Sequence, residues 1–233
     1  GLTPYVDVLR ARPESAALRE VLTALLTADR EAMAETVGQA ARAARDRAAP
    51  SAAYAACAAV ADHHPGAPGV LATLLLHHVV LQPGEALHLG AGVPHAYLRG
   101  LGVEIMANSD NVLRCGLTQK HVDVPELLRV VRFEAGEPAV LRPEPAGGGE
   151  EVYRTPTAEF RLSRYRLTSG GPEPEPVGDA PQILLCTAGE AVLHSSEDGS
   201  ELRLPPGGSA YLRAAAKVRM HGEGTIFRAT VAG

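Results

Sequence analysis

Residues 81–120 read LQPGEALHLGAGVPHAYLRGLGVEIMANSDNVLRCGLTQK, and this stretch decides the expected fold. It opens on a Pro-Gly turn signal, continues with a short strand pattern over 86–89 and bends again over 90–94. His95 follows that bend directly. A histidine aimed out of a tight bend between strands can hold a divalent ion, whereas a lone histidine that packs or hydrogen-bonds is the alternative.

A second pattern follows this histidine. Residues 94–98 read PHAYL, and residues 103–120 read VEIMANSDNVLRCGLTQK. Here the chain resembles the type I phosphomannose isomerases, whose signature runs glutamate, any residue, methionine, two residues, Ser-Asp-Asn, then Arg-Ala-Gly, any residue, Thr-Pro-Lys. The matching positions are Glu104, Met106, Ser109, Asp110, Asn111, Arg114, Gly116, Thr118 and Lys120. Cys115 and Gln119 stand where alanine and proline are usual, and the second change loosens the turn beside Lys120.

The resemblance implies a cupin fold, because a turn, a strand, a Gly/Pro bend and a histidine follow each other in the second metal-binding half of a cupin barrel. We expect a mainly β protein with an α-helical unit and two jelly-roll barrels, one incomplete and one small and C-terminal. The expected domains are a helical unit over 1–70, the C-terminal half of the catalytic cupin barrel over 71–133, and a second, non-catalytic cupin-like barrel over 134–233.

Helical patterns fill the N-terminal part of the chain. Residues 14–30 place leucine, valine and alanine on one helical face behind Pro13, and further helices are expected over 31–47 and 51–63. Their alanine richness favours helix formation but predicts a thin core. A strand-like run over 74–81 follows.

Short alternating segments dominate the C-terminal part. A helix over 124–131 and an acidic, Pro/Gly-rich connection over 134–151 precede them. The expected strands cover 160–167, 182–187, 190–194, 200–204, 209–212 and 225–231. An internal repeat supports a second barrel, because PGGSAYL at 206–212 echoes PGEALHL at 83–89, and its continuation places Val218 opposite His95. This barrel is therefore expected to lack metal, with His194 and His221 facing solvent or capping.

The resemblance also implies a zinc site. In the family, zinc is held by a glutamine and a histidine two residues apart, by a later glutamate and by the histidine of the Pro-His-Ala-Tyr turn. Only the last has a counterpart in this chain, His95, and one imidazole cannot hold zinc, which takes three protein ligands and an open position in a catalytic site. The other ligands of the Zn²⁺ ion are expected upstream of residue 1, so the chain alone should have little activity.

Aldose–ketose isomerisation moves a proton between C1 and C2 through an enediol, so negative charge develops on the sugar oxygens. By resemblance, Arg114 lies at the catalytic cavity and stabilises that charge; the alternative is an ion pair with Asp110 or Glu104. Lys120 suits the substrate phosphate, or is an ordinary solvated cation. Glu104 stands in an apolar frame and either orients a ligand or pairs with a buried cation. Tyr97 lines the pocket or packs in the core.

Composition narrows the class of protein. The 233 residues are 45% hydrophobic and carry 22 Lys and Arg against 27 Asp and Glu, a formal net charge of −5, so we expect no nucleic-acid partner. No apolar run approaches the roughly 18 residues that span a membrane, and the first residues do not predict a secretory signal, so we expect no membrane partner. The 3 cysteines are far apart, which predicts no disulfide framework and a cytoplasmic location.

Together these observations predict a zinc-dependent isomerase that interconverts mannose 6-phosphate and fructose 6-phosphate, of which this chain is a part. The alternative is a non-catalytic sugar-phosphate-binding or regulatory cupin, which the missing ligands allow. Both hypotheses give a small-molecule sugar phosphate as the partner. The sequence leaves the oligomeric state open, a monomer included.

Overall fold

The computed structural model describes residues 1–109 and 111–231. The chain divides into two compact units, which we describe one at a time. The first unit comprises Gly1–Val80, Leu89–Gly100 and Asp110–Ala139, and the second comprises Leu81–His88, Leu101–Ser109 and Val140–Gly233. The signature residue Asp110 lies outside the described residues.

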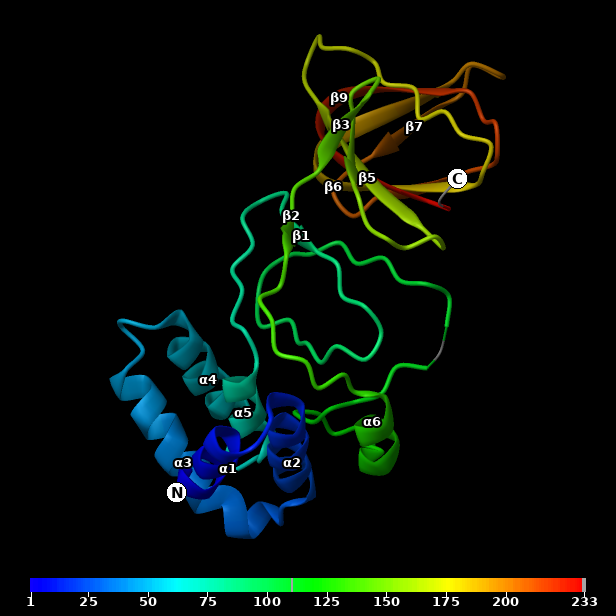
Figure 1. Cartoon of the computed structure of the whole chain (residues 1–233). Helices are drawn as coiled ribbons and strands as arrows, with labels where there is room; N and C mark the ends of the chain where they lie inside the picture. Colours follow the sequence, from blue (N-terminus) through cyan, green and yellow to red (C-terminus); the bar gives the residue numbers. More distant parts are fainter. Residues whose placement is uncertain (110, 232–233) are drawn as a thin grey trace. The chain divides into compact units, whose positions relative to one another are not determined.

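The first unit is built mainly of helices. They are α1 (Thr3–Ala11), α2 (Glu14–Thr27), α3 (Arg30–Asp46), α4 (Ala52–His63), α5 (Gly69–Ala72), the 3₁₀ turn η1 (Thr73–Leu75) and α6 (Val124–Val130) (Figure 1). The sequence-based helices over 14–30, 31–47, 51–63 and 124–131 are confirmed, whereas α1 and α5 were not expected. The predicted strand over 74–81 is wrong, because its first residues complete a 3₁₀ turn and the rest is irregular.

Side-chain caps fix where these helices begin. The Asp29 carboxylate accepts the backbone N–H of Ala32 at 2.8 Å, and the Asp123 carboxylate accepts that of Glu126 at 3.0 Å. The helices pack through small side chains, as the alanine-rich sequence predicts. The buried cluster is Val21, Leu25, Val37, Ala40, Ala41, Ala44, Cys57, Ala58, Val60, Ala61, Val70 and Leu71.

Helix α6 packs against α2 within the same unit. Leu22, Leu127, Val131 and Phe133 form a second buried cluster. The Arg19 guanidinium lies 4.4 Å from the centroid of the Phe133 ring. This cluster holds the chain that follows the signature segment against the helices.

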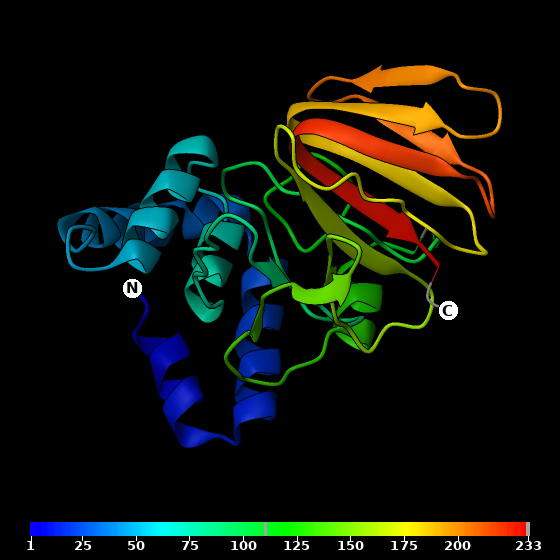
Figure 2. The same ribbon diagram turned by 90° about the horizontal axis from the view of Figure 1, so that it is seen from above.

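The second unit contains an antiparallel sheet. Its strands are β3 (Glu144–Gly147), β4 (Glu150–Tyr153), β5 (Arg161–Leu167), β6 (Gln182–Ser195), β7 (Glu201–Leu204), β8 (Ser209–Leu212) and β9 (Val218–Thr230) (Figure 2). Their order is β3-β4-β5-β9-β6-β7, and β8 pairs with β6 outside this path. The antiparallel sheet confirms the β character expected here, while its closure into a cupin barrel stays a prediction.

Three details of the sheet differ from the sequence-based expectation. The strand expected over 225–231 begins earlier, since β9 covers Val218–Thr230. The connection expected over 134–151 contains β2 (Val140–Leu141) and the β3–β4 hairpin, because its glycine triplet, with φ of +90°, +59° and +80°, forms a tight turn. The segments 182–187 and 190–194 form one strand, β6, in which the register shifts between Cys186 and Ala188.

Alternate residues of the strands form the core of this unit. The buried cluster is Tyr165, Leu167, Leu184, Cys186, Ala191, Leu193, Leu204, Ala210, Leu212, Met220 and Ile226. The internal repeat is also visible in the backbone, because Gly84 and Gly207 have φ of +90° and +83° and each precedes a strand.

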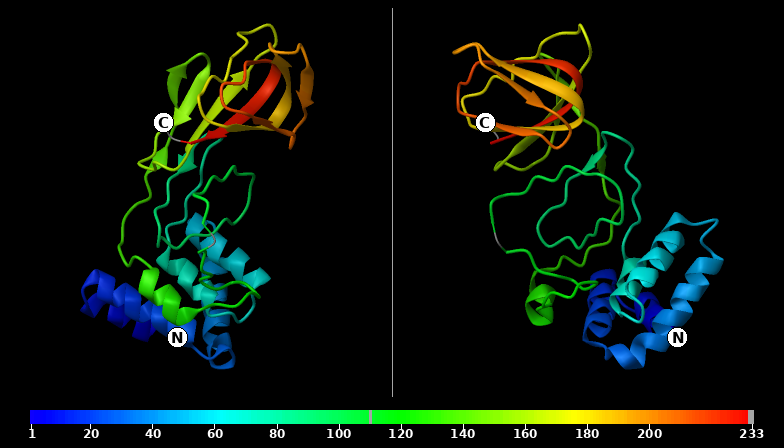
Figure 3. Two further views of the ribbon diagram at one scale, coloured as in Figure 1. Left: turned by 90° about the vertical axis from the view of Figure 1, so that its right-hand side faces the viewer. Right: turned by 180° about the vertical axis from the view of Figure 1, so that it is seen from behind.

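The signature segment is mostly irregular. Strand β1 (Ala86–Leu87) pairs with β2 (Val140–Leu141), but the described residues of 88–123 form neither helix nor strand (Figure 3). A strand needs a neighbour for its N–H and C=O groups, and no described strand pairs with these residues. In the part of the chain that the structure describes, no helix has the length and apolar character needed to cross a bilayer.

Candidate active site

His95 follows a bend that is fixed inside the first unit. Gly92 has φ of +80°, and a Cβ atom there would lie 2.5 Å from the Val130 carbonyl oxygen, so the position requires glycine. The Arg132 N–H donates to the Gly92 carbonyl oxygen at 2.9 Å. The bend before His95 is therefore tied to the chain that leaves α6.

The imidazole of His95 makes one hydrogen bond to the backbone. Its Nδ1 lies 3.0 Å from the Val93 carbonyl oxygen, which can only accept, so Nδ1 carries the proton in this contact. The second ring nitrogen, Nε2, then keeps its lone pair. Ligating histidines in proteins commonly donate their other ring N–H to a carbonyl or a carboxylate in this way.

Tyr97 lies beside this imidazole. The two ring centroids are 5.9 Å apart and the ring planes are inclined at 60°, an edge-to-face arrangement. The Tyr97 side chain is 74% exposed, so the alternative that it packs in the core is wrong. Its role in lining a substrate pocket stays a prediction.

Glu104 and Arg114 lie on irregular backbone. Glu104 belongs to the second unit and is exposed, while Val103 and Ile105 on either side of it are half-buried. The role expected for Glu104, orienting a ligand or pairing with a cation, stays a prediction. Arg114 belongs to the first unit and is exposed.

Lys120 ends a loop that is anchored on the helical core. Its backbone N–H donates to the Thr118 hydroxyl at 3.1 Å, and its side chain is exposed. The anchor is Leu117, whose backbone has φ of +52° and whose side chain packs against the buried helical cluster. A Cβ atom at Gly69 would lie 3.2 Å from that side chain. Sequence reasoning missed this anchor, because nothing in the signature marks Leu117 as a packing residue.

Cys115, one of the two departures from the signature, is half-buried. It packs beside the cluster of α2 and α6, and burial raises the pKa of its thiol. The thiol is therefore held in its neutral form and takes the place of a small apolar side chain.

The described residues do not complete a metal site. Among them, no group of three or more His, Cys, Asp and Glu side chains is placed to hold an ion. Zinc in a catalytic site takes three protein ligands, and the role of His95 as one of them stays a prediction.

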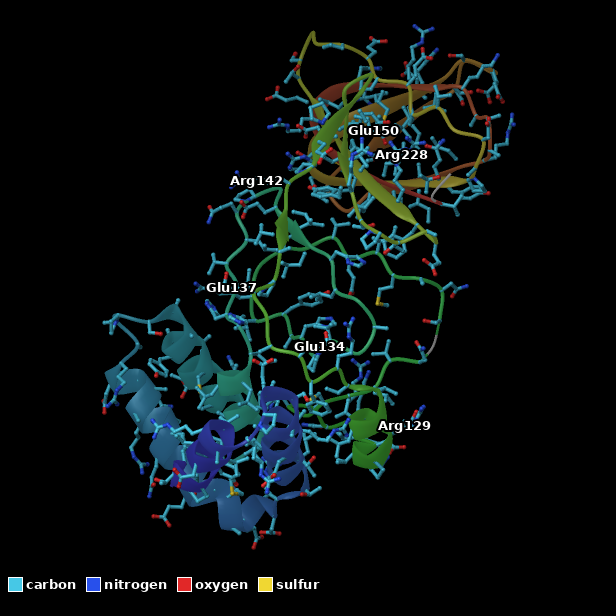
Figure 4. All side chains as sticks on the ribbon, viewed as in Figure 1. Arg129, Glu134, Glu137, Arg142, Glu150 and Arg228 are labelled. Atoms are coloured by element: carbon cyan, nitrogen blue, oxygen red, sulfur yellow. The ribbon has the colours of Figure 1, made fainter. Side chains whose placement is uncertain are left out.

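The second unit holds a charged centre that sequence reasoning missed. Arg228 is 5% exposed; its guanidinium donates to Glu150 Oε1 at 2.9 Å, to Gln182 Oε1 at 2.6 Å and to the Val177 carbonyl oxygen at 2.9 Å (Figure 4). These contacts occupy the guanidinium, so the loss of one partner would leave buried polar groups unsatisfied. Burial, followed by the charge of Glu150, raises the pKa of Tyr165 next to it.

Two hollows lie on the second unit, with volumes of about 630 and 370 Å³. Both are lined by Glu85, Arg142 and Pro143; the larger also by Arg154 and the smaller also by Arg164. Each of the arginines here is paired with a glutamate. The sequence-predicted site residues do not line either hollow.

Comparison with known proteins gives a consistent set of relatives. The chain is 40% identical over 172 residues to mannose-6-phosphate isomerase of Salmonella typhimurium, a match that covers 72% of this chain and 43% of that protein. It is 41% identical over 145 residues to the enzyme of that name from Cryptococcus neoformans, covering 60% of this chain and 33% of the relative. Mannose-6-phosphate isomerase 1 of Arabidopsis thaliana is 34% identical over 167 residues, with coverage of 69% and 39%. The chain matches no protein-family model.

Solved structures give the same picture. A single-residue mutant of phosphomannose isomerase from Salmonella typhimurium superposes with a TM-score of 0.86 and 33% identity, covering 99% of this chain and 58% of that one. The apo form of that mannose 6-phosphate isomerase gives a TM-score of 0.85. The chain spans less than half the length of the curated relatives it matches. On this similarity of sequence and structure, the chain belongs to the mannose-6-phosphate isomerase family.

Proposed function

We propose that this chain forms part of a zinc-dependent isomerase that interconverts mannose 6-phosphate and fructose 6-phosphate. The observation that carries the proposal is the identity of 40% over 172 residues with a protein named mannose-6-phosphate isomerase. The match includes the signature over 104–120, which contains the charged residues Glu104, Arg114 and Lys120. Composition supports a small-molecule substrate rather than a polyanion, because the formal net charge is −5.

In this proposal, the site residues of the chain bind and stabilise the substrate. The Arg114 guanidinium stabilises the negative charge that develops on the sugar oxygens of the enediol, because it stays protonated throughout. The Lys120 ammonium binds the phosphate as a compact point charge. Tyr97 and Glu104 border the sugar. Separate solved variants of the Salmonella enzyme replace a glutamate and an arginine that have the same spacing as Glu104 and Arg114, which supports the choice of this pair.

The metal part of the proposal rests on His95. Its Nδ1 contact with the Val93 carbonyl oxygen leaves Nε2 as a ligand atom. A zinc ion bound there would supply a Lewis acid that polarises the sugar oxygens. The described residues of the chain provide one ligand, so the remaining ligands belong to parts of the enzyme that correspond to regions of the relatives outside the match.

The domain division also belongs to the proposal. We infer a helical unit over 1–70, half of a catalytic cupin barrel over 71–133 and a second cupin-like barrel without catalytic residues over 134–233. The antiparallel ladders of β5, β6 and β9 support the last of these, and the Gly84 and Gly207 turns support the repeat. The cytoplasm, where cysteines stay reduced, is the proposed location.

The second candidate function is a sugar-phosphate-binding or regulatory cupin without catalysis. One observation favours it: among the described residues, no group of three or more His, Cys, Asp and Glu side chains is placed to hold an ion. In such a module, Arg114 and Lys120 would bind the phosphate without any proton transfer.

One experiment separates the two functions. The 233-residue chain and the longest natural protein that contains it are purified, and each is assayed for conversion of mannose 6-phosphate with zinc and after chelation. The isomerase proposal expects turnover in the longer protein, its loss on chelation and little turnover in the short chain. Saturable binding of mannose 6-phosphate by both, with no conversion under any condition, would establish the binding module instead.

A further inference from the structure

Alternate residues of the signature segment pack into the helices of the first unit. Leu113 and Cys115 pack against the buried cluster of α2 and α6. Leu117 packs against the buried cluster that α2, α3, α4 and α5 form. These three residues are half-buried, whereas Arg114 and Lys120 are exposed. The helices therefore hold the segment through its apolar side chains and leave its two cations free to meet solvent or a ligand.

The backbone of Leu117 is strained. Its φ is +52°, a region that residues with a branched side chain rarely adopt. Among the described residues other than glycine, only Leu117 and Ala215 have a positive φ. A conformation of this kind persists where the surrounding contacts over-determine it. Glycine at this position would relieve the strain, but it would also remove the side chain that packs into the helical cluster. Packing of the Leu117 side chain therefore holds the strained backbone in place.

Gly69, the first residue of α5, lies against Leu117. A Cβ atom at Gly69 would lie 3.2 Å from Cγ and Cδ2 of Leu117 and 3.4 Å from its backbone nitrogen. A Cβ atom at Gly116 would lie 3.9 Å from the Gly69 Cα and from Leu26 Cδ2. The chain around Leu117 thus rests on the backbone of a helix end, which cannot change rotamer to make room.

This contact lies close in the chain to both cations of the candidate site. Arg114 precedes Leu117 by three residues and Lys120 follows it by three, and three residues span at most about 10 Å. On the Lys120 side, the Lys120 N–H donates to the Thr118 hydroxyl at 3.1 Å, which closes the short connection. A displacement of Leu117 is therefore passed to Arg114 and Lys120 over a short length of chain.

We propose that Leu117, held against Gly69, is a positioning residue that places Arg114 and Lys120 for the isomerase reaction. The inference rests on the proposed function, which gives the two cations their roles. All four residues belong to the first unit. The helices then serve the reaction as a rigid support, and Leu117 acts through its neighbours in the chain and not by contact with the sugar phosphate.

The first test changes the support at this contact alone. Gly69→Ala places a methyl group against Leu117, which must move by a few tenths of an ångström, while alanine favours the helix over glycine. In the 233-residue chain, the assigned NMR signals of Arg114 and Lys120 should shift. The matched control is Gly38→Ala in α3, whose methyl group would lie 3.5 Å from Arg42 Nη1, the end of a flexible side chain. It should leave both signals in place. Unmoved Arg114 and Lys120 signals in Gly69→Ala overturn the proposal.

The second test measures turnover in an active protein that contains this chain. Gly69→Ala should lower kcat/KM for mannose 6-phosphate by about tenfold at a temperature well below the thermal midpoint. We expect kcat to fall because Arg114 is displaced, and KM to rise because Lys120 is displaced. The thermal midpoint should stay unchanged, and Gly38→Ala should behave as the original protein. A contact that only stabilises the fold would lower the midpoint and leave kcat and KM unchanged, and that result overturns the positioning role.

Variants of Leu117 test whether the two residues act together. Leu117→Ala should lower kcat/KM more than Gly69→Ala, and Leu117→Met, which keeps the volume, should restore most of it. The double variant Gly69→Ala/Leu117→Ala should lose no more than Leu117→Ala alone, because the smaller side chain leaves room for the methyl group. Losses that multiply would mean that the residues act independently, and the proposal would be wrong. If Leu117→Ala does not fold, Gly69→Ala decides.

The outcomes also separate this inference from the proposed function. Shifted Arg114 and Lys120 signals in a protein without isomerase activity support the positioning and reject the proposed function. Isomerase turnover that neither Gly69→Ala nor Leu117→Ala changes supports the proposed function and rejects the positioning.

Discussion

Arg228 Nη1 lies 2.9 Å from Glu150 Oε1 although the two residues are 78 positions apart in the chain. Arg228 is 5% exposed and the Glu150 side chain is 12% exposed, so water screens this pair very little. Removing Arg228 leaves the buried Glu150 carboxylate with only the more exposed Arg161, 3.2 Å away, as a charged partner. Arg228→Met should therefore lower the free energy of unfolding by about 3–5 kcal/mol, measured by chemical denaturation.

The matched control is another arginine–glutamate pair of the same sheet. Arg203 and Glu190 are 2.8 Å apart, but their side chains are 69% and 51% exposed. Exposed pairs contribute about 1 kcal/mol or less, so Arg203→Met should have a small effect. Equal losses in the two variants would mean that burial does not decide the strength of the Arg228 pair.

Features that depend on neighbouring residues in the chain were predictable from the sequence, and features that depend on distant residues were not. The helices over 14–27, 30–46 and 52–63 were predictable because helix propensity and apolar periodicity are local. The β3–β4 hairpin was missed because a glycine triplet, here Gly147 to Gly149, is also typical of a linker. The continuity of β6 was missed because a bulge at Cys186–Ala188 looks like a break in the alternation.

In the candidate site too, local contacts could be predicted from the sequence and long-range contacts could not. His95 and Tyr97 are two residues apart, so their proximity follows from the sequence. The contact between Tyr153 and Gly84 spans 69 positions, and no pattern in either stretch indicates it. The exposure of Glu104 could not be predicted, because an apolar frame in the sequence does not say which side of the backbone faces the core.

His95 gives a prediction about metal content. The 233-residue chain should bind zinc weakly, because its described residues hold no group of three or more candidate ligands, whereas an isomerase that contains the chain should hold zinc stoichiometrically. His95→Ala in the longer protein should lower the zinc content, measured by elemental analysis after dialysis. His221→Ala, in the sheet of the second unit, is the control and should keep the metal. A tight one-to-one zinc complex of the short chain that survives His95→Ala would contradict this assignment.

Arg114 gives a prediction about turnover. In an isomerase that contains the chain, Arg114→Ala should lower kcat by about a hundredfold or more, the usual effect of losing one preorganised charge-stabilising donor. Zinc content and the thermal midpoint should stay close to their original values, because Arg114 is exposed. Arg129→Ala is the control, since Arg129 is 71% exposed and pairs with Glu126 in its own helix. Loss of the fold or of the metal in Arg114→Ala would make Arg114 a structural residue.

Asp198 gives a prediction about pH. Hydrogen bonds from the hydroxyl and the backbone N–H of Ser200 lower the pKa of Asp198 to about 2. A folded-state pKa below the unfolded value stabilises the protein above the unfolded pKa, about 3.9. This stability is lost as pH falls from about 4 toward 2. Denaturation midpoints measured across that window should therefore fall less steeply in Asp198→Asn, and an unchanged slope would show that Ser200 does not hold the ionised carboxylate.

The histidines of the second unit test whether that unit takes part in catalysis. His194 lies in the β6–β7 ladder, with its Nδ1 3.7 Å from Glu201 Oε1. His221 of β9 is the backbone partner of Val192 in β6. Neither belongs to a cluster of metal ligands among the described residues. Glutamine at either position should leave isomerase activity within about threefold. Substitutions away from the core and from buried polar networks usually change the free energy of unfolding by no more than about 0.5 kcal/mol.

Val218, the repeat counterpart of His95, should respond differently. It is half-buried and packs against the core of the sheet, so Val218→Asp places an unpaired charge beside apolar side chains. The thermal midpoint should fall, and activity should fall only as the protein unfolds. Turnover and midpoint measured on the same samples, with Val218→Thr as the milder control, separate packing from chemistry. Reduced turnover at an unchanged midpoint, for Val218→Asp or for either histidine variant, would mean that the second unit supplies a group to the reacting site.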